Sequence, residues 1–301
     1  MSALTAIWEP DWPCPGPSIL SVLRRGSGDP TYRITPDGAH WLGMRTPDGA
    51  ASLRLNFQPQ RVEITAWGQG AQWAVDGVPA LLGADDDPTG FEPQHPILIE
   101  AWRRHQHWRI GRTNRIWEAL APAIIEQKVT GQEAFGGFRR LVYRFGERAP
   151  GAGNEQGLWI QPAPQTVRAI PSWEWLKLHI DPARSKALVA AASRVSALER
   201  VGDPDLLDQR LRALPGIGVW TSAEVRFRAL GDPDAVSFGD YHVAANIGWA
   251  LTGSPIDDAE LAVLLEPWRP HRHRVQRLIE LAGLSRPRHG PRMAPRTHLP
   301  R

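Results

Sequence analysis

The chain of 301 residues contains one cysteine, Cys14. A single thiol cannot build a disulfide framework, and it cannot supply the several thiolates of a cysteine zinc site or an iron–sulfur cluster. The sequence also lacks any apolar run near the roughly 18 residues that a transmembrane helix needs. Its first residues include Glu9 and Asp11 and no basic segment of the kind that begins a signal peptide. We therefore expect a cytoplasmic protein with no metal, no cofactor and no membrane partner.

Lysine is scarce as well. Only Lys128, Lys177 and Lys186 occur among the 35 basic residues, and the formal net charge is +3. The last 17 residues hold five arginines and no acidic residue, so the rest of the chain is close to neutral. Proline and glycine separate these arginines, which predicts a disordered basic tail over residues 285–301. The preference for arginine can reflect phosphate recognition or simply genome composition.

The first third of the sequence has the hydrophobic pattern of β-strands. Leu53, Leu55 and Phe57 alternate with polar residues, and a second alternating run follows a turn at 58–60. Two such runs around a turn predict a hairpin with one buried face. Further strands are expected at 32–34, 41–44 and 72–75. We assign residues 1–94 to a β-rich N-terminal domain.

From about residue 95 the hydrophobic period becomes helical. Ile116, Leu120 and Ile124 recur every four residues, and Thr113 or Asn114 can cap this helix. Further helices are expected around 135–142, 165–169, 172–178, 183–195, 257–266 and 271–283, with a loop at 147–164. The predicted fold is therefore α+β, with an all-helical domain at 95–284 after the antiparallel β-rich domain.

The best-defined unit is a pair of helices joined by a glycine-rich hairpin. Asp203 followed by proline marks the first helix start, and Gly216, Ile217 and Gly218 separate this helix from a second one that opens at Trp220. Two glycines permit a tight turn, and the helix that follows presents free N–H groups and the positive end of its dipole. This arrangement binds a phosphate without reading a base. The alternative is an ordinary turn between two helices.

A single acid stands at the start of the next helix. Asp240 follows Phe238 and Gly239, and the helix after it carries Val243 and Ile247 on its apolar side. An aspartate at such a position is normally an N-cap. The capping role is compatible with a chemical one, because a capping carboxylate is held in a fixed position and can face a pocket.

These residues resemble a known family. The segments LPGIGVWTSAEV (214–225) and FGDYH (238–242) are similar to the hairpin and the aspartate of the helix-hairpin-helix superfamily of DNA base-excision glycosylases. The segments AIIEQKVT (123–130) and LEPWRPHRHRV (265–275) resemble parts of its DNA-3-methyladenine glycosylase II branch, which repairs alkylation damage. The resemblance covers residues 95–283, and the N-terminal region fits the extra antiparallel β domain of that branch.

The resemblance implies a reaction. Enzymes of this family flip a damaged base out of double-stranded DNA and hydrolyse its N-glycosidic bond. Asp240 is the implied catalytic residue, because a fixed carboxylate stabilises the positive charge that develops on the sugar. Relatives that also cut the strand place a lysine shortly after the second hairpin glycine, where this chain has Trp220. The resemblance thus implies a monofunctional enzyme that acts on alkylated purines of the 3-methyladenine type and leaves an abasic site.

It also implies two sets of binding residues. We expect contacts with the DNA backbone from Gly216, Ile217, Gly218, Thr221 and Lys128, and a substrate pocket that includes Trp220, Tyr241 and Gln127. For Trp220 and Tyr241, packing in the protein core is the alternative. The expected partner is duplex DNA with a damaged base, bound by a monomer that works on the nucleoid. The arginine tail either adds salt-sensitive affinity for DNA or is merely solvated.

The chain departs from the family pattern at three positions. Lys128 occupies the place of an apolar wedge, and Glu224 and Glu280 stand where well-known members carry aromatic residues. Acids in the pocket suit a cationic base or indicate another lesion. Two alternative functions stay open: a DNA-binding protein without catalysis, and a glycosylase for deaminated or oxidised bases.

A histidine-rich segment invites a metal interpretation. His271 and His273 are two residues apart, so they point in different directions on a helix, and no carboxylate or cysteine cluster accompanies them. We therefore expect no metal site. Arg269 and Arg272 are expected to contact phosphate or to lie exposed on the surface.

Overall fold

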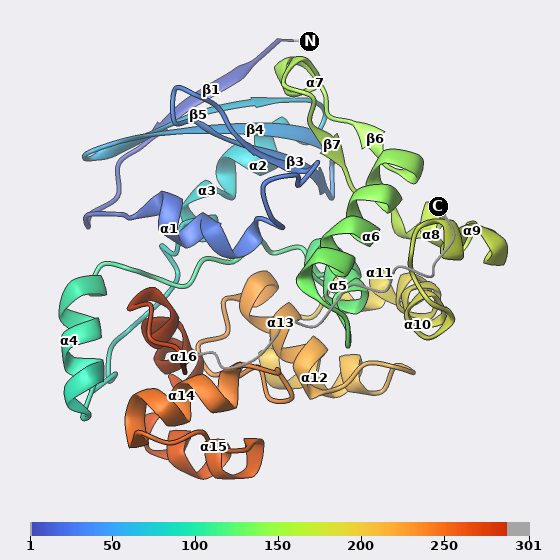
Figure 1. Cartoon of the computed structure of the whole chain (residues 1–301). Helices are drawn as coiled ribbons and strands as arrows, with labels where there is room; N and C mark the ends of the chain where they lie inside the picture. Colours follow the sequence, from blue (N-terminus) through green and yellow to red (C-terminus); the bar gives the residue numbers. More distant parts are fainter. Residues whose placement is uncertain (1, 288–301) are drawn as a thin grey trace.

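A computed structural model describes residues 2–287 (Figure 1). The first third of the chain forms a five-stranded antiparallel sheet at the top of Figure 1, with most of the helices below it. The sheet has the order β1-β5-β4-β3-β2. Its strands are β1 (Leu4–Trp8), β2 (Tyr32–Ile34), β3 (His40–Thr46), β4 (Gly49–Gln58) and β5 (Arg61–Trp67). The α+β fold that the sequence predicts is confirmed.

The predicted hairpin is present, and its register buries one face. Leu55 pairs with Ile64 and Leu53 with Ala66, and each of these side chains is at most 3% exposed. The strands expected at 32–34 and 41–44 are also found. The alternating pattern therefore identified both the strands and the face that packs inward.

The strand expected at 72–75 is wrong, because these residues belong to helix α2 (Ala71–Asp76). Ala71, Ala74 and Val75 have helical spacing and pack into the core beneath the sheet, where α3 (Val78–Leu81) continues the layer. Alternation over four residues does not distinguish a strand from one turn of helix, so burial against the sheet decides the conformation.

The segment at 147–164, expected to be a loop, also contains regular structure. Strand β6 (Glu147–Arg148) pairs with β7 (Trp159–Ile160), and α7 (Ala152–Glu155) lies between them. Ile160 is fully buried in a cluster with Trp41 of the sheet. Packing against a distant strand orders this segment although its glycine and proline content favours a loop.

Helix α5 (Ile116–Ile125) is the centre of the helical part. Its predicted stripe is almost completely buried, and α10 (Pro182–Ala192) and α13 (Val219–Leu230) pack against it. The expected caps Thr113 and Asn114 do not close its N-terminus. Glu199 does so instead, because its carboxylate accepts hydrogen bonds from the amides of Ile116 at 2.9 Å and Trp117 at 2.8 Å. A partner this far along the chain leaves no local signal.

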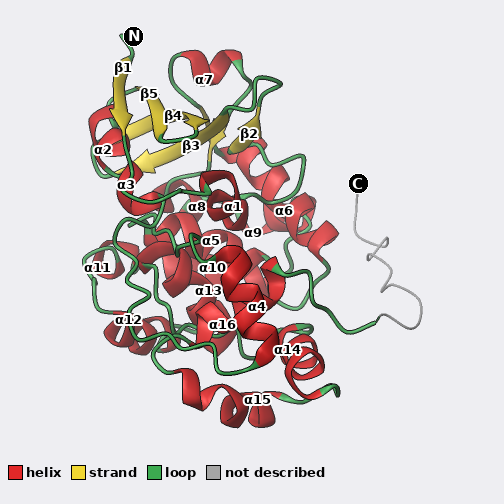
Figure 2. Cartoon of the chain, turned by 90° about the vertical axis from the view of Figure 1, so that its left-hand side faces the viewer, coloured by secondary structure: helices red, strands yellow, loops and turns green. Residues whose placement is uncertain are grey.

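The other helices surround this centre (Figure 2). They are α1 (Gly16–Leu20), α4 (Pro96–His105), α6 (Gly131–Phe145), α8 (Pro164–Arg168), α9 (Ser172–Lys177), α11 (Val195–Leu198), α12 (Pro204–Arg212), α14 (Val243–Thr252), α15 (Asp258–Leu265) and α16 (Arg272–Leu281), with short 3-10 turns at Ser21–Leu23 and Glu266–Trp268. Both views place α14 and α15 at the end of the molecule far from the sheet. Within residues 2–287, no helix has the length and apolar character to cross a membrane.

The N-terminal segment does not pack on the sheet alone. Ile19 of α1 shares a small cluster with Trp108 and with Leu281 of α16. Because this cluster joins the N-terminal and helical parts, packing alone does not define a boundary between them. The domain boundaries expected at residues 94 and 284 stay predictions. The expected basic tail lies outside the described residues from position 288 onward.

Candidate active site

A cavity of about 240 Å³ lies between α13, α14 and α16. Its wall includes Asp240 from the loop before α14, together with Phe227 of α13, Val243 of α14 and Gln276 of α16. At about 30 Å³ per water molecule, this space equals the volume of roughly eight waters. The carboxyl group of Asp240, the acid that the sequence analysis singled out, therefore faces an open cavity that has room for a ligand.

Three hydrogen bonds orient the carboxylate of Asp240. Oδ1 accepts from the amides of His242 at 2.8 Å and Val243 at 3.2 Å, and Oδ2 accepts from the indole Nε1 of Trp220 at 3.2 Å. The two amide bonds close the start of α14, as an N-terminal cap does, from two residues before the N-cap residue His242. The indole bond ties the acid to the first turn of α13.

The hairpin between α12 and α13 has one face directed into the protein and one left open. Ile217 is 6% exposed and belongs to the main core, which anchors the turn. Gly216 has a φ of 80°, in the left-handed region that favours glycine. A Cβ atom on Gly218 would meet nothing within 4 Å, so this side of the backbone is free. The first helical bond of α13 joins the Ser222 amide to the Gly218 carbonyl, so the three amides before Ser222 precede the helical ladder.

The hairpin and the acid meet at Trp220. This residue follows Gly218 by two positions, and its indole binds Asp240. A Cβ atom on Gly239 would lie 3.8 Å from the Cβ of Trp220, so the two backbones approach closely here. The glycine-rich turn and the aspartate, 22 positions apart, therefore form one site.

Gln127 contacts the hairpin and does not line the cavity. Its Nε2 donates to the Gly216 carbonyl at 2.9 Å and to the Thr221 hydroxyl at 2.8 Å. Thr221 is only 2% exposed, so its side chain faces Gln127 and cannot reach DNA. We therefore assign Gln127 to support of the turn and retain only the backbone of Thr221 in the expected DNA contact. Lys128 is exposed on the surface beside them.

The two aromatic candidates lie outside the cavity wall. Trp220 is half-buried and contacts Asp240 through its indole N–H. Tyr241 is 90% exposed, which contradicts the alternative that it packs in the core. The pocket roles expected for both residues stay predictions.

Both unusual acids of the sequence line the cavity. Glu224 is paired with Arg228 at 2.5 Å, one helical turn further along α13. Glu280 of α16 is paired with Arg277. The cavity is therefore more acidic than an aromatic-lined pocket, and each acid has a guanidinium partner. Sequence reasoning named the two acids but missed their arginines, although spacings of four and three residues on a helix signal such pairs.

His273 is a buried part of the same wall. It is 1% exposed and stacks on Phe227 with the ring centroids 4.4 Å apart. Burial, aided by the nearby cations Arg277, Arg228 and Arg274, holds the pKa of His273 well below its ordinary value. The ring is therefore neutral at physiological pH.

The remaining expectations for this segment concern metal and phosphate. No group of three or more potential metal ligands occurs in the part of the chain that the structure describes. Arg272 binds the Asp234 carboxylate through two nitrogens, at 2.8 and 2.6 Å, and Arg269 binds it at 3.1 Å. Arg269 is exposed, as the alternative expectation had it, whereas the Arg272 side chain is largely buried in its pair with Asp234. The phosphate contacts expected of the two arginines stay predictions.

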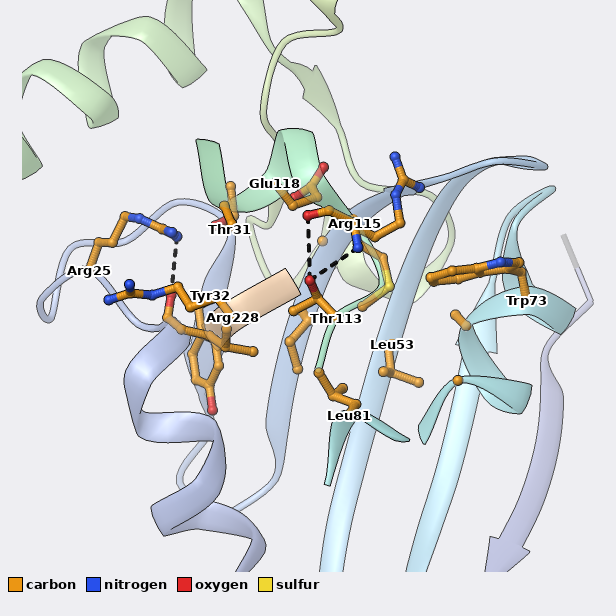
Figure 3. A pocket seen from close by; sticks show the side chains of 17 residues that line it. Arg25, Thr31, Tyr32, Leu53, Trp73, Leu81, Thr113, Arg115, Glu118 and Arg228 are labelled. Carbon is orange, nitrogen blue, oxygen red and sulfur yellow. Dashed lines mark hydrogen bonds between the residues drawn. The ribbon is translucent and has the colours of Figure 1, made fainter. Parts of the chain in front are cut away.

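A second cavity, of about 70 Å³, lies between the sheet and the helices (Figure 3). Leu53 of the sheet, Leu81 of α3 and Trp73 of α2 form much of its apolar wall. Glu118 of α5 and Arg228 add charge. Arg228 also lines the cavity at Asp240, so the two cavities share this residue.

Comparison with solved structures defines the fold class. The chain superposes with a TM-score of 0.75 on a 3-methyladenine DNA glycosylase from Archaeoglobus fulgidus, at 15% identity, over 92% of this chain and 97% of that one. It superposes with a TM-score of 0.71 on the 8-oxoguanine glycosylase/lyase of Clostridium acetobutylicum, at 10% identity, over 92% of this chain and 95% of that one. This chain therefore has the fold of these solved DNA glycosylases, and the fold that the sequence resemblance implies is confirmed.

Comparison with curated sequences adds a relative whose name refers to DNA repair. The chain is 26% identical over 246 residues to the Mycobacterium tuberculosis protein named "Probable bifunctional transcriptional activator/DNA repair enzyme AlkA". The match covers 78% of this chain and 48% of the relative, so the chain spans about half the length of that protein. No protein-family model matches the chain.

Proposed function

We propose that this protein is a DNA glycosylase that hydrolyses the N-glycosidic bond of a base held in the 240 Å³ cavity, with Asp240 as the catalytic residue. One observation carries the proposal. The Asp240 carboxylate is oriented by three donors and faces an open cavity, and the indole of Trp220 connects it to a hairpin whose backbone has a free face. The fold of the solved glycosylases and the name of the sequence relative support it.

The chemistry follows from the position of this carboxylate. A base within a duplex must leave the stack before an enzyme can reach its glycosidic bond, which costs a few kcal/mol. As the base departs, positive charge develops on the sugar, and the preplaced anion of Asp240 stabilises that charge. The amides of His242 and Val243 prevent the carboxylate from rotating away, so little reorganisation is needed during the reaction.

The hairpin supplies the grip on DNA in this proposal. A phosphate can approach Gly218 closely because no side chain covers that face, and the amides before Ser222 are positioned to donate to it. Lys128 lies exposed near the same turn, where its charge adds affinity that does not depend on sequence. We propose duplex DNA with a damaged base as the partner and a monomer as the working form.

We further propose that the enzyme is monofunctional and prefers alkylated purines. A lyase step requires an amine that attacks the sugar. The three lysines of the chain, Lys128, Lys177 and Lys186, are absent from the described cavity wall, and Trp220 follows the hairpin. Alkylated purines carry positive charge and leave readily, so a carboxylate without a strong general acid is sufficient for them.

The test is single-turnover release of bases from duplexes that each carry one defined lesion. Asp240→Asn keeps an oxygen that can cap α14 but removes the charge, and we expect base release to slow by about a hundred- to a thousandfold while DNA binding persists. Asp203→Asn is the matched control, because Asp203 caps α12 through the Leu206 amide at 2.7 Å, outside the cavity wall. Trp220→Phe removes only the indole donor and should cost about tenfold.

Three outcomes would contradict parts of this proposal. Equal base release by wild type and Asp240→Asn excludes the catalytic role of this acid. Strand breaks without alkali, together with a borohydride-trapped covalent complex, exclude the monofunctional reaction. DNA binding without release of any base favours a non-catalytic DNA-binding protein.

A further inference from the structure

The wall of the Asp240 cavity carries a continuous chain of polar side chains that the proposed bond cleavage does not use. It connects α13 with α16 through the loop before α14, and a guanidinium stands at each end. In order its members are Arg228, Glu224, Ser237, Gln276, Glu280 and Arg277. All six line the cavity.

Every side-chain donor in the middle of this chain is already used. The Ser237 hydroxyl donates to Glu224 at 2.6 Å. The Ser237 amide is an obligate donor and faces Oε1 of Gln276 at 3.2 Å, which fixes the orientation of the carboxamide. The two hydrogens of Gln276 Nε2 then point to the Ser237 hydroxyl at 3.5 Å and to Glu280 at 3.0 Å. Ser237 and Gln276 therefore offer a ligand no side-chain hydrogen.

The two carboxylates still have acceptor capacity. An ionised carboxylate has about four lone-pair sites. Glu224 uses its oxygens for Arg228 and Ser237, and Glu280 uses its oxygens for Arg277 and Gln276. The Glu224 side chain is 11% exposed and that of Glu280 is 38% exposed. Glu280 is therefore the acceptor that a base in the cavity can reach.

We propose that Glu280 determines specificity, by selecting bases whose edge presents two adjacent N–H donors, as a guanine-type alkylated base does. This inference rests on the proposed glycosylase function. A guanine edge offers N1–H and the exocyclic amino group side by side, which a carboxylate accepts through both oxygens. Hypoxanthine lacks the exocyclic amino group, so in the same pose it offers N1–H beside a C2–H, and only one carboxylate oxygen receives a hydrogen bond.

The carboxamide of glutamine lacks this double match. Glu280→Gln keeps the size of the side chain but replaces one acceptor oxygen with an amino group. In the same pose, glutamine accepts from only one of the two guanine donors and turns its own amino group toward the other, whereas hypoxanthine keeps its single hydrogen bond from N1–H. The substitution is therefore expected to remove the preference for guanine-type bases and not to weaken the release of every base.

The experiment measures single-turnover release of 7-methylguanine and of hypoxanthine from otherwise identical duplexes. For Glu280→Gln we expect 7-methylguanine release to fall about tenfold or more, the loss typical of one hydrogen bond to a charged group, while hypoxanthine release is unchanged. Titration with the free bases provides a readout without catalysis, and the affinity for 7-methylguanine should fall by the same factor. Glu266→Gln is the control, because Glu266 is paired with Arg269 at the surface and is absent from the cavity wall.

The failure of this inference differs from the failure of the proposed function. If wild type releases both bases and Glu280→Gln leaves their ratio unchanged, Glu280 has no role in specificity and the glycosylase proposal stands. If wild type releases neither base nor any other lesion, the glycosylase proposal fails, and this inference fails with it. An equal loss for both bases with an unchanged melting temperature also overturns the inference, because it indicates a general effect on the site.

Discussion

The two cavities of this protein differ in size, in lining and in the origin of their walls. The cavity at Asp240 has about 240 Å³, and its wall combines polar and apolar side chains, most of them from α13, α14 and α16. The cavity beneath the sheet has about 70 Å³, and residues from the sheet and the helices enclose it. Space for a ligand and oriented polar groups coincide only in the first of these two. The second lies where two layers of the structure meet.

Buried charge serves different purposes in the two places. Beneath the sheet, Glu118 lies among Arg115, Arg45 and Arg25 but forms no close ion pair within residues 2–287. Its carboxylate accepts one long hydrogen bond from the Arg45 amide at 3.4 Å. At Asp240 the acids are paired or capped by donors at 2.5–3.2 Å. Close pairing fixes a side chain in one position, which a reaction requires and a layer contact does not.

We expect the largest effect from substitution of Arg228, the residue that lines both cavities. Arg228 pairs with Glu224 and donates Nε to the Val22 carbonyl at 3.1 Å. Arg228→Met leaves Glu224 buried without its cation, which we expect to lower the free energy of unfolding by about 3–5 kcal/mol and to abolish base release. Urea denaturation measures the stability. Arg212→Met, which breaks a surface pair with Asp208, should cost less than about 1 kcal/mol. Equal losses would show that Arg228 is not a buried partner.

Filling each cavity separately tests which one receives a base. Val243→Phe places a ring in the larger cavity beside Asp240 and keeps the amide that binds this acid. We expect single-turnover base release to fall by about a hundredfold, or about 2.7 kcal/mol, while the fold persists. Ala119→Val fills part of the smaller cavity and should leave the release rate within about twofold, with a stability change below about 1.5 kcal/mol. The reverse pattern would exchange the roles of the two cavities.

The buried histidine in the wall of the larger cavity should make the stability of the protein sensitive to acid. The folded pKa of His273 is lowered well below its ordinary value, so the unfolded chain binds the proton more readily. Stability is therefore retained above about pH 6.5 and falls as the pH decreases below it, with a slope of at most about 1.4 kcal/mol per pH unit for this one group. Urea unfolding between pH 7.5 and 5 measures the slope. His273→Leu should reduce it, and an unchanged slope would assign the acid sensitivity to other groups.

The elements at the centre of this site are specified by short stretches of sequence, so the sequence could predict them. Gly216 marks the hairpin because its left-handed φ favours glycine, and Asp240 marks a helix start because its carboxylate caps free amides. The stripe of α5 and the alternation of β4 and β5 identified two cores. Each of these signals spans fewer than about twelve residues and depends on the nearest neighbours.

The features that sequence reasoning missed depend on contacts between distant segments. Gln127 reaches the hairpin across 89 positions, and Glu199 caps α5 across 83. Ser237 and Gln276 meet only because the loop before α14 and helix α16 line the same cavity. No periodicity encodes such contacts, so the support of the site could not be inferred although its centre could.

The smallest effect is expected beneath the sheet, where the pH dependence has the opposite sign. Burial raises the pKa of Glu118 above its ordinary value, so the folded state holds the proton more tightly than the unfolded state. The contribution of Glu118 to stability therefore decreases as the pH rises above about 4.3, the ordinary value for glutamate. Glu118→Gln removes this dependence and should stabilise the protein relative to wild type by less than about 1 kcal/mol at pH 7, and by less at pH 4. Base release should stay within about twofold, because Glu118 is not part of the wall at Asp240. A gain in stability that is larger at pH 4 than at pH 7 would contradict the sign, and a lost activity would show that the smaller cavity communicates with the larger one through Arg228.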